Sequence, residues 1–171
     1  MLFALLYPRF TAADRAAVDA MRAAHDPHRA RLVDPHITLV FGVAEASPAP
    51  LLALAEQLAA ETSRFAVTFD GFHVEADPRD RTRKVLLDAV EGRESVAALH
   101  EAFYEARPAA ERLPFTAHMT VATTMTDAAE RAAISAAEAL PRPIRGTVEA
   151  IAIERLADGR LTRLGAFPLA D

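Results

Sequence analysis

Two tripeptides of the form His-x-Thr carry the residues best suited to chemistry in this chain of 171 residues. The first opens the apolar stretch HITLVF at residues 36–41, and the second opens HMTVAT at residues 118–123, 82 positions later. In a β-strand, side chains at positions i and i+2 point to the same face, about 6.6 Å apart along the chain. Each tripeptide therefore presents an imidazole and a hydroxyl on one face: His36 with Thr38, and His118 with Thr120.

This set of side chains suits a phosphate ester. Threonine hydroxyls can donate hydrogen bonds to the non-bridging oxygens of a phosphate. A neutral histidine can accept a proton from an attacking oxygen, while a protonated histidine gives one to the leaving oxygen. If the two strands meet at a pseudo-two-fold axis, we expect acid–base cleavage or transfer of a phosphodiester at a ribose, with no metal ion or other cofactor.

A structural explanation competes with the functional one. A single His-x-Thr in a strand is most often a polar edge or a satisfied core histidine. Two of them at matching positions of a duplicated chain favour an active site. The remaining alternative is an ancestral duplication that has kept its strands and lost its activity.

The elements that must position these residues repeat along the chain. The expected order in each half is strand, helix, histidine strand, helix, strand: 2–7, 11–26, 31–43, 47–58 and 65–74, then 84–90, 94–106, 115–123, 127–140 and 144–154, with a hairpin turn at Asp158-Gly159 and a last strand at 160–167. A shift of about 82 residues aligns Leu5–Tyr7 with Leu87–Ala89. This repeat predicts one bilobal α+β domain over residues 1–171, with approximate halves 1–80 and 81–171. We expect two lobes of mixed or antiparallel sheet backed by helices, with the active cleft between them.

Several local predictions concern the other histidines. The stretch HDPHR is expected to form a turn. His25, Asp26 and His28 could together mimic a metal site, but Pro27 and the turn context favour a solvated loop. His100, on the helix at 94–106, is expected at the surface.

Composition limits the classes of function. The chain has no cysteine, which excludes disulfides, thiolate zinc sites and a cysteine nucleophile, and fits a reducing compartment. The net charge of −5 gives no overall attraction for a polyanion, so we expect no stable nucleic-acid complex. The charged stretch at 77–84 favours a solvated loop over a contact with an RNA backbone. With neither a signal peptide nor a membrane span, the sequence predicts a cytoplasmic monomer without membrane contact.

These motifs resemble those of the two-histidine phosphoesterase superfamily, in particular its bacterial 2′-5′ RNA ligase-like branch. The resemblance rests on the paired His-x-Thr strands, the duplicated halves and the stretch PHITLVF, and it covers essentially the whole chain. It implies a bilobal fold and an enzyme that hydrolyses 2′,3′-cyclic phosphates or makes and breaks 2′-5′ linkages, acting on RNA 3′ ends or small nucleotides. By the same analogy His36, Thr38, His118 and Thr120 are the catalytic set. His118 would activate water and His36 would protonate the departing ribose oxygen.

The sequence departs from that family at one place. Many relatives have leucine-alanine-arginine after the second His-x-Thr, whereas this chain has Val121, Ala122 and Thr123. The missing arginine weakens the expectation of tight RNA binding more than that of the core chemistry. Phe41 lies where relatives place an aromatic residue that can stack on a base, but strict alternation puts it on the Ile37 face of the strand.

Two other functions stay open at this stage. One is a phosphodiesterase for a cyclic phosphate that is not RNA. The other is a catalytically weak module that binds a phosphorylated ligand or RNA, which salt-sensitive RNA binding without turnover would favour. Hydrolysis that depends on both histidines distinguishes an enzyme from the binding module.

Overall fold

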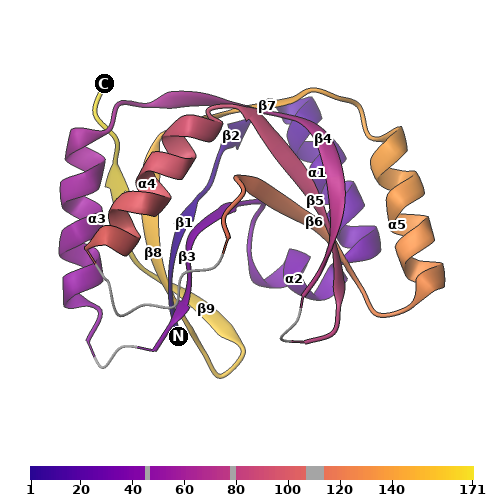
Figure 1. Cartoon of the computed structure of the whole chain (residues 1–171), viewed down its shortest axis with the longest axis horizontal. Coiled ribbons are helices and arrows are strands. Elements are labelled where there is room, and N and C mark those ends of the chain that lie inside the picture. Colours follow the sequence, from indigo (N-terminus) through magenta and orange to yellow (C-terminus); the bar gives the residue numbers. More distant parts are fainter. Residues whose placement is uncertain (45–46, 78–79, 107–113) are drawn as a thin grey trace.

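Two antiparallel sheets organise the chain, which the computed structural model describes over residues 1–44, 47–77, 80–106 and 114–171 (Figure 1). The first sheet has the order β3-β1-β8-β9, with β1 (Leu2–Leu6), β3 (Ile37–Val43), β8 (Ala150–Ala157) and β9 (Arg160–Pro168). The second has the order β2-β7-β4-β5-β6, with β2 (Arg9–Phe10), β4 (Phe65–Ala76), β5 (Arg83–Glu91), β6 (His118–Thr124) and β7 (Ile144–Val148).

The described residues include five helices, four of which cover the two sheets in pairs. They are α1 (Ala12–His25), α2 (Pro27–Leu32), α3 (Ala49–Glu61), α4 (Arg93–Glu105) and α5 (Asp127–Ala139). Helices α3 and α4 pack against the first sheet, and α1 and α5 against the second (Figure 1). The predicted α+β layout of antiparallel sheets and helices is confirmed. No helix in the part of the chain that the structure describes is long and apolar enough to cross a membrane.

Each sheet takes strands from both halves of the sequence. Strands β1 and β3 of the first half continue into β8 of the second, and β5 and β6 of the second half continue into β4 of the first. The orders β3-β1-β8 and β6-β5-β4 therefore correspond, as a duplication requires. Because each half contributes two strands to the other sheet, β8 and β9 to the first and β2 and β4 to the second, a lobe of this structure is not a contiguous half of the chain.

The alignment of the halves needs a correction of one residue. Thr38 pairs with Leu5 and Thr120 pairs with Leu86, so the structural counterpart of Leu5 is Leu86 and not Leu87. The segment that joins the first strand to the histidine strand is one residue longer in the second half. A single shift of 82 residues aligns His36 with His118, but it places β1 one residue out of register with β5.

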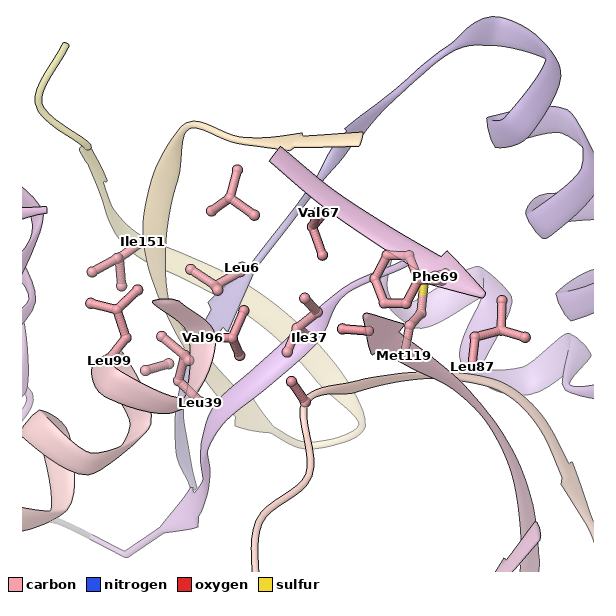
Figure 2. Close-up of a cluster of buried hydrophobic side chains, with 14 of the residues drawn as sticks. Leu6, Ile37, Leu39, Val67, Phe69, Leu87, Val96, Leu99, Met119 and Ile151 are labelled. Carbon is pink, nitrogen blue, oxygen red and sulfur yellow. The ribbon is translucent and has the colours of Figure 1, made fainter. Parts of the chain in front are cut away.

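One continuous hydrophobic core joins the two sheets (Figure 2). Ile37 and Met119, the residues that follow the two histidines, are both fully buried in it, with Ile151 of the first sheet and Phe69 of the second. Complete burial of side chains of this size contributes about 1.5–3 kcal/mol each. The core thus fixes the backbone of both histidine strands.

The predicted turn at HDPHR is wrong, because residues 27–32 form helix α2. Asp26 caps this helix by accepting a hydrogen bond from the backbone N–H of Arg29 at 3.3 Å, and Pro27 occupies the first turn. Aspartate at the N-cap and proline at the first helical position are both favourable for a helix start. The same two residues also favour turns, and only the chain that follows decides between them.

The predicted single strand at 144–154 is also wrong. Its first part is β7 in the second sheet and its second part is β8 in the first, with Glu149 between them. The carbonyl of Glu149 accepts a hydrogen bond from the backbone N–H of Leu169 at 2.9 Å. The apolar pattern runs through this crossing, because both parts face the core. The hairpin turn at Asp158-Gly159 is confirmed, and both residues have positive φ, 50° and 70°.

The charged stretch at 77–84 is partly drawn into the second sheet. Arg83 and Lys84 begin β5, where Arg83 pairs with Glu130 at 2.7 Å and Lys84 pairs with Asp77. These two cations are therefore engaged within the protein. Arg79 lies outside the described residues.

His100 is buried, which corrects its expected place at the surface. Only 4 % of the residue is exposed, its ring stacks on Phe115 at 3.8 Å between centroids, and its Nδ1 lies 2.8 Å from the carbonyl oxygen of Leu39. Because that oxygen can only accept, Nδ1 carries the proton and donates. The helix α4 thereby holds strand β3 next to the candidate site.

Replacing His100 by phenylalanine should lower the free energy of unfolding by about 1–3 kcal/mol. Phenylalanine keeps an aromatic ring against Phe115 but leaves the buried Leu39 carbonyl without this donor. Urea denaturation followed by circular dichroism measures the loss. His28→Ala, on an exposed position of α2, should stay within about 0.5 kcal/mol of the unmodified protein. A loss below that size in His100→Phe would contradict the clamping role.

Candidate active site

The first histidine strand is shorter than the predicted 31–43, because β3 begins at Ile37: His36 directly precedes it and Thr38 lies within it. His36 and Thr38 are half-buried on one face, while Ile37 and Leu39 are buried on the other. The alternation follows from the pleat of the strand. His36 and Thr38 thus share an accessible face of the first sheet.

The second His-x-Thr repeats this arrangement on β6. His118 and Thr120 are half-buried on one face, and Met119 and Val121 are completely buried on the other. Strands β3 and β6 contact each other, although they belong to different sheets. The structure therefore brings the two predicted pairs into one region.

Each histidine is held by a hydrogen bond of the same kind, from its Nδ1 to a backbone carbonyl. Nδ1 of His36 lies 2.7 Å from the carbonyl oxygen of Asp34, and Nδ1 of His118 lies 2.7 Å from that of Thr116, two residues earlier in each case. Since a carbonyl oxygen can only accept, Nδ1 carries a proton in both rings. In the neutral form, Nε2 then has the lone pair, so each ring can exchange a proton with a ligand through Nε2.

A β-bulge follows each His-x-Thr and changes which face the next residues occupy. On β3, Thr38 pairs with Leu5 and Val40 with Ala4, so Leu39 is the additional residue. Phe41 consequently lies on the Thr38 face, where it is 48 % exposed and packs edge-on against Phe3 at 5.6 Å. The strict alternation assumed from sequence placed Phe41 on the wrong face.

The bulge on β6 has the corresponding effect. Thr120 pairs with Leu86 and Ala122 with Val85, so Val121 is the additional residue. Thr123 therefore joins His118 and Thr120 on the accessible face. Phe41 and Thr123 each follow their histidine by five residues, and in each strand the bulge turns the residue at this position to the histidine face.

The surroundings of His36 disfavour its protonated form. Removal from water lowers the pKa of His36 to about 4, although its bond to the Asp34 carbonyl acts in the opposite direction. The positive charges of Arg22, His118 and Arg29 lower it further. Their influence also shows that the two histidines lie within electrostatic reach of each other. His36 is therefore neutral over most of the pH range in which proteins work.

The surroundings of His118 differ from those of His36 because they include carboxylates. Removal from water again lowers the pKa of His118, and the charge of His73 acts in the same direction. The Thr116 carbonyl and the carboxylates of Glu75 and Asp88 oppose this change. His73 and Asp88 form a hydrogen-bonded pair, with Nδ1 and Oδ1 2.7 Å apart. Carboxylates thus oppose the lowering of the His118 pKa, whereas the charges that act most strongly on His36 are positive.

On the His36 side, Tyr7, directly after β1, lies near Glu154 of β8 and Arg163 of β9. The Tyr7 ring is 6.0 Å from that of His36, and the Arg163 guanidinium lies 4.9 Å above Tyr7. Arg163 donates to the buried carboxylate of Glu154 at 3.0 and 3.1 Å. Burial and the neighbouring Glu154 raise the pKa of Tyr7, so its phenol stays protonated. Nothing in the sequence placed these three residues near the histidines.

The described ranges, with their gaps at 45–46, 78–79 and 107–113, contain no group of three or more histidine, aspartate or glutamate side chains placed to hold a metal ion. In the region of His25 and His28, the carboxylate of Asp26 accepts hydrogen bonds from Arg29 and Thr123. Those oxygens are thus engaged by protein donors.

Comparison with known proteins gives a consistent result. A family model described as the 2′-5′ RNA ligase superfamily matches residues 10–160. Among curated protein sequences, none matches this chain.

Solved structures show the same fold. Usb1 of Kluyveromyces marxianus superposes with a TM-score of 0.68 at 11% identity, covering 98% of this chain and 97% of its own. TT0787 of Thermus thermophilus gives 0.67 at 22% identity, with 98% and 97% covered. E. coli LigT, in a complex with ATP, gives 0.62 at 22% identity, with 99% and 97% covered. At these identities the similarity establishes the fold.

Proposed function

This chain belongs to the 2′-5′ RNA ligase superfamily, a family of phosphoesterases and ligases. We propose that it is a phosphodiesterase that opens 2′,3′-cyclic phosphates on RNA 3′ ends or on small nucleotides. The alternative within the same chemistry is an enzyme that breaks and joins 2′-5′ linkages. His36, Thr38, His118 and Thr120 form the proposed catalytic set. No metal ion takes part in the proposed reaction.

The observation that carries the proposal is the matched tethering of the two imidazoles. Each ring donates from Nδ1 to a backbone carbonyl and keeps Nε2 for proton transfer. In hydrolysis, one Nε2 accepts a proton from water as the water oxygen bonds to phosphorus. The bond from phosphorus to one ribose oxygen breaks, and the other Nε2 gives that oxygen a proton. The hydroxyls of Thr38 and Thr120 donate to the non-bridging oxygens.

The electrostatic surroundings favour a definite division of roles. His36, with its pKa lowered to about 4 among cations, is neutral and suited to accept the proton of water. His118, supported by Asp88 and Glu75, is the better proton donor. We therefore assign the base to His36 and the acid to His118, the reverse of the assignment that the family resemblance suggested.

The face around His36 also suits a nucleoside. Phe41 is exposed on the Thr38 face, and the ring of Tyr7 lies beside His36. Exposed aromatic rings near a phosphate site provide stacking surfaces, worth about 1–3 kcal/mol per base. This supports a nucleotide or RNA end as substrate over a cyclic phosphate without a base.

The direct test is hydrolysis of a short RNA that ends in a 2′,3′-cyclic phosphate, in the presence of EDTA. We expect conversion to a phosphomonoester, which chromatography and phosphatase sensitivity identify. A 2′-5′-linked dinucleotide and a base-free cyclic phosphodiester, assayed in parallel, define the substrate class. Absence of turnover on all three, with or without divalent cations, would overturn the enzymatic proposal and favour a binding module.

A further inference from the structure

Helix α2 brings an arginine to the face of β6 that carries the second histidine. Nη1 of Arg29 donates to the hydroxyl of Thr123, and the same nitrogen lies 3.4 Å from Oδ2 of Asp26. The Thr123 hydroxyl in turn donates to that Oδ2 at 2.7 Å. Asp26 is only 8 % exposed and also caps α2 through its other oxygen. The side chains of Thr123 and Asp26 thus hold the guanidinium beside β6.

The location of Thr123 makes this contact relevant to the site. Because of the bulge at Val121, Thr123 shares its face with His118 and Thr120. The charge of Arg29 also reaches across to His36, where it disfavours protonation. Arg29 thus contacts one histidine strand directly, and its charge acts on the histidine of the other.

Arg29 retains the capacity to bind an anion. A guanidinium has five N–H donors in a planar fork that matches a phosphate. Nη2 forms an ion pair with Oδ2 of Asp80 at 3.7 Å, which is longer than a hydrogen bond, and the arginine side chain is 36 % exposed. Nη2 can therefore turn to an incoming oxygen while Nη1 stays on Thr123 and Asp26.

We propose that Arg29 is a phosphate-binding residue of the active site, which contacts a non-bridging oxygen of the phosphate held between His36 and His118. Arg29, from α2, supplies a positive charge next to Thr123, the position of β6 at which many relatives have an arginine. This inference rests on the proposed function, since it uses the same phosphate site. It adds a residue that lies 94 positions from Thr123 in the sequence.

The test compares Arg29→Gln with Arg31→Gln, an exposed arginine two residues further along α2. Removing a donor to the charge that develops on phosphate costs roughly 10²–10³-fold in kcat. We expect a loss of that size in Arg29→Gln on the cyclic-phosphate RNA end, and a change of less than about twofold in Arg31→Gln. The double variant Arg29→Gln with Thr123→Arg should recover at least roughly tenfold, because Asp26 remains in place to orient the new guanidinium.

A binding measurement keeps this test separate from the test of turnover. Calorimetric titration with adenosine 2′-monophosphate and with adenosine measures how much affinity the phosphate adds. Arg29→Gln should lose most of that difference, and the double variant should regain it, whether or not the protein turns over any substrate. The inference is overturned if Arg29→Gln keeps the difference, if the second substitution restores none of it, or if the unmodified protein binds both compounds equally.

Discussion

Replacing either His36 or His118 by alanine should reduce kcat for the cyclic-phosphate RNA end by roughly 10²–10⁴-fold. Each residue supplies one of two proton transfers through Nε2, and alanine removes that atom together with the Nδ1 bond to the backbone. The double variant should lose little more than the worse single variant if both transfers occur in one step, since residues that act as a unit have non-additive effects. Initial rates at saturating substrate measure these losses.

His28→Ala is the matched control for these variants. This histidine lies on α2 in the same region of the chain but is exposed to solvent. Its replacement should leave kcat within about twofold of the unmodified enzyme. A similar loss in all three variants would point to general destabilisation, and full activity in His36→Ala or His118→Ala would remove that residue from the catalytic set.

The pH dependence of kcat/KM should be bell-shaped, with its maximum in the acidic range. Below about pH 4 the rate falls because His36 becomes protonated and can no longer accept a proton. On the alkaline side it falls as His118 loses its proton, with a midpoint below the ordinary value of 6.5, since the pKa of His118 is lowered. Between pH 5 and pH 8 we therefore expect a decrease of roughly 30-fold or more. Stopped assays in buffers of constant ionic strength provide the profile.

Asp88→Asn provides a directional check on this assignment. The carboxylate of Asp88 opposes the lowering of the His118 pKa. Without it, the alkaline limb should move to lower pH while the acid limb stays in place. A shift of the acid limb instead would reverse the two roles, and a rate that rises steadily to pH 9 would contradict the acid–base pair.

The two histidines occupy equivalent positions of the two halves but have different neighbours. Both rings have the same backbone tether, but Tyr7 lies beside His36 whereas Asp88 pairs with His118 across the strands. Strand pairing makes Tyr7 and Asp88 equivalent positions of the two halves. The carboxylate of Asp88 opposes the lowering of the His118 pKa, whereas the protonated phenol of Tyr7 supplies no such negative charge to His36.

Local rules were enough to predict much of this protein. The strict period of two in a strand separated His36 and Thr38 from the buried Ile37, and the same pattern held at His118. Thr11 directly precedes α1 and caps it, because its Oγ1 accepts a hydrogen bond from the Asp14 N–H at 3.1 Å. These features depend on neighbours a few residues away, so the sequence determined them directly.

Other features depend on pairing between distant segments, and only the tertiary structure decided them. A bulge is defined by the partner strand, so no pattern within β3 or β6 showed that Phe41 and Thr123 turn to the histidine face. The contact of Asp26 with Thr123 joins residues 97 positions apart, and the same two side chains hold the guanidinium of Arg29 beside β6. The sequence by itself determined which four residues could act on a phosphate. The folded chain determined which charges surround them, because electrostatic interactions depend on distance in space and on burial, not on position along the chain.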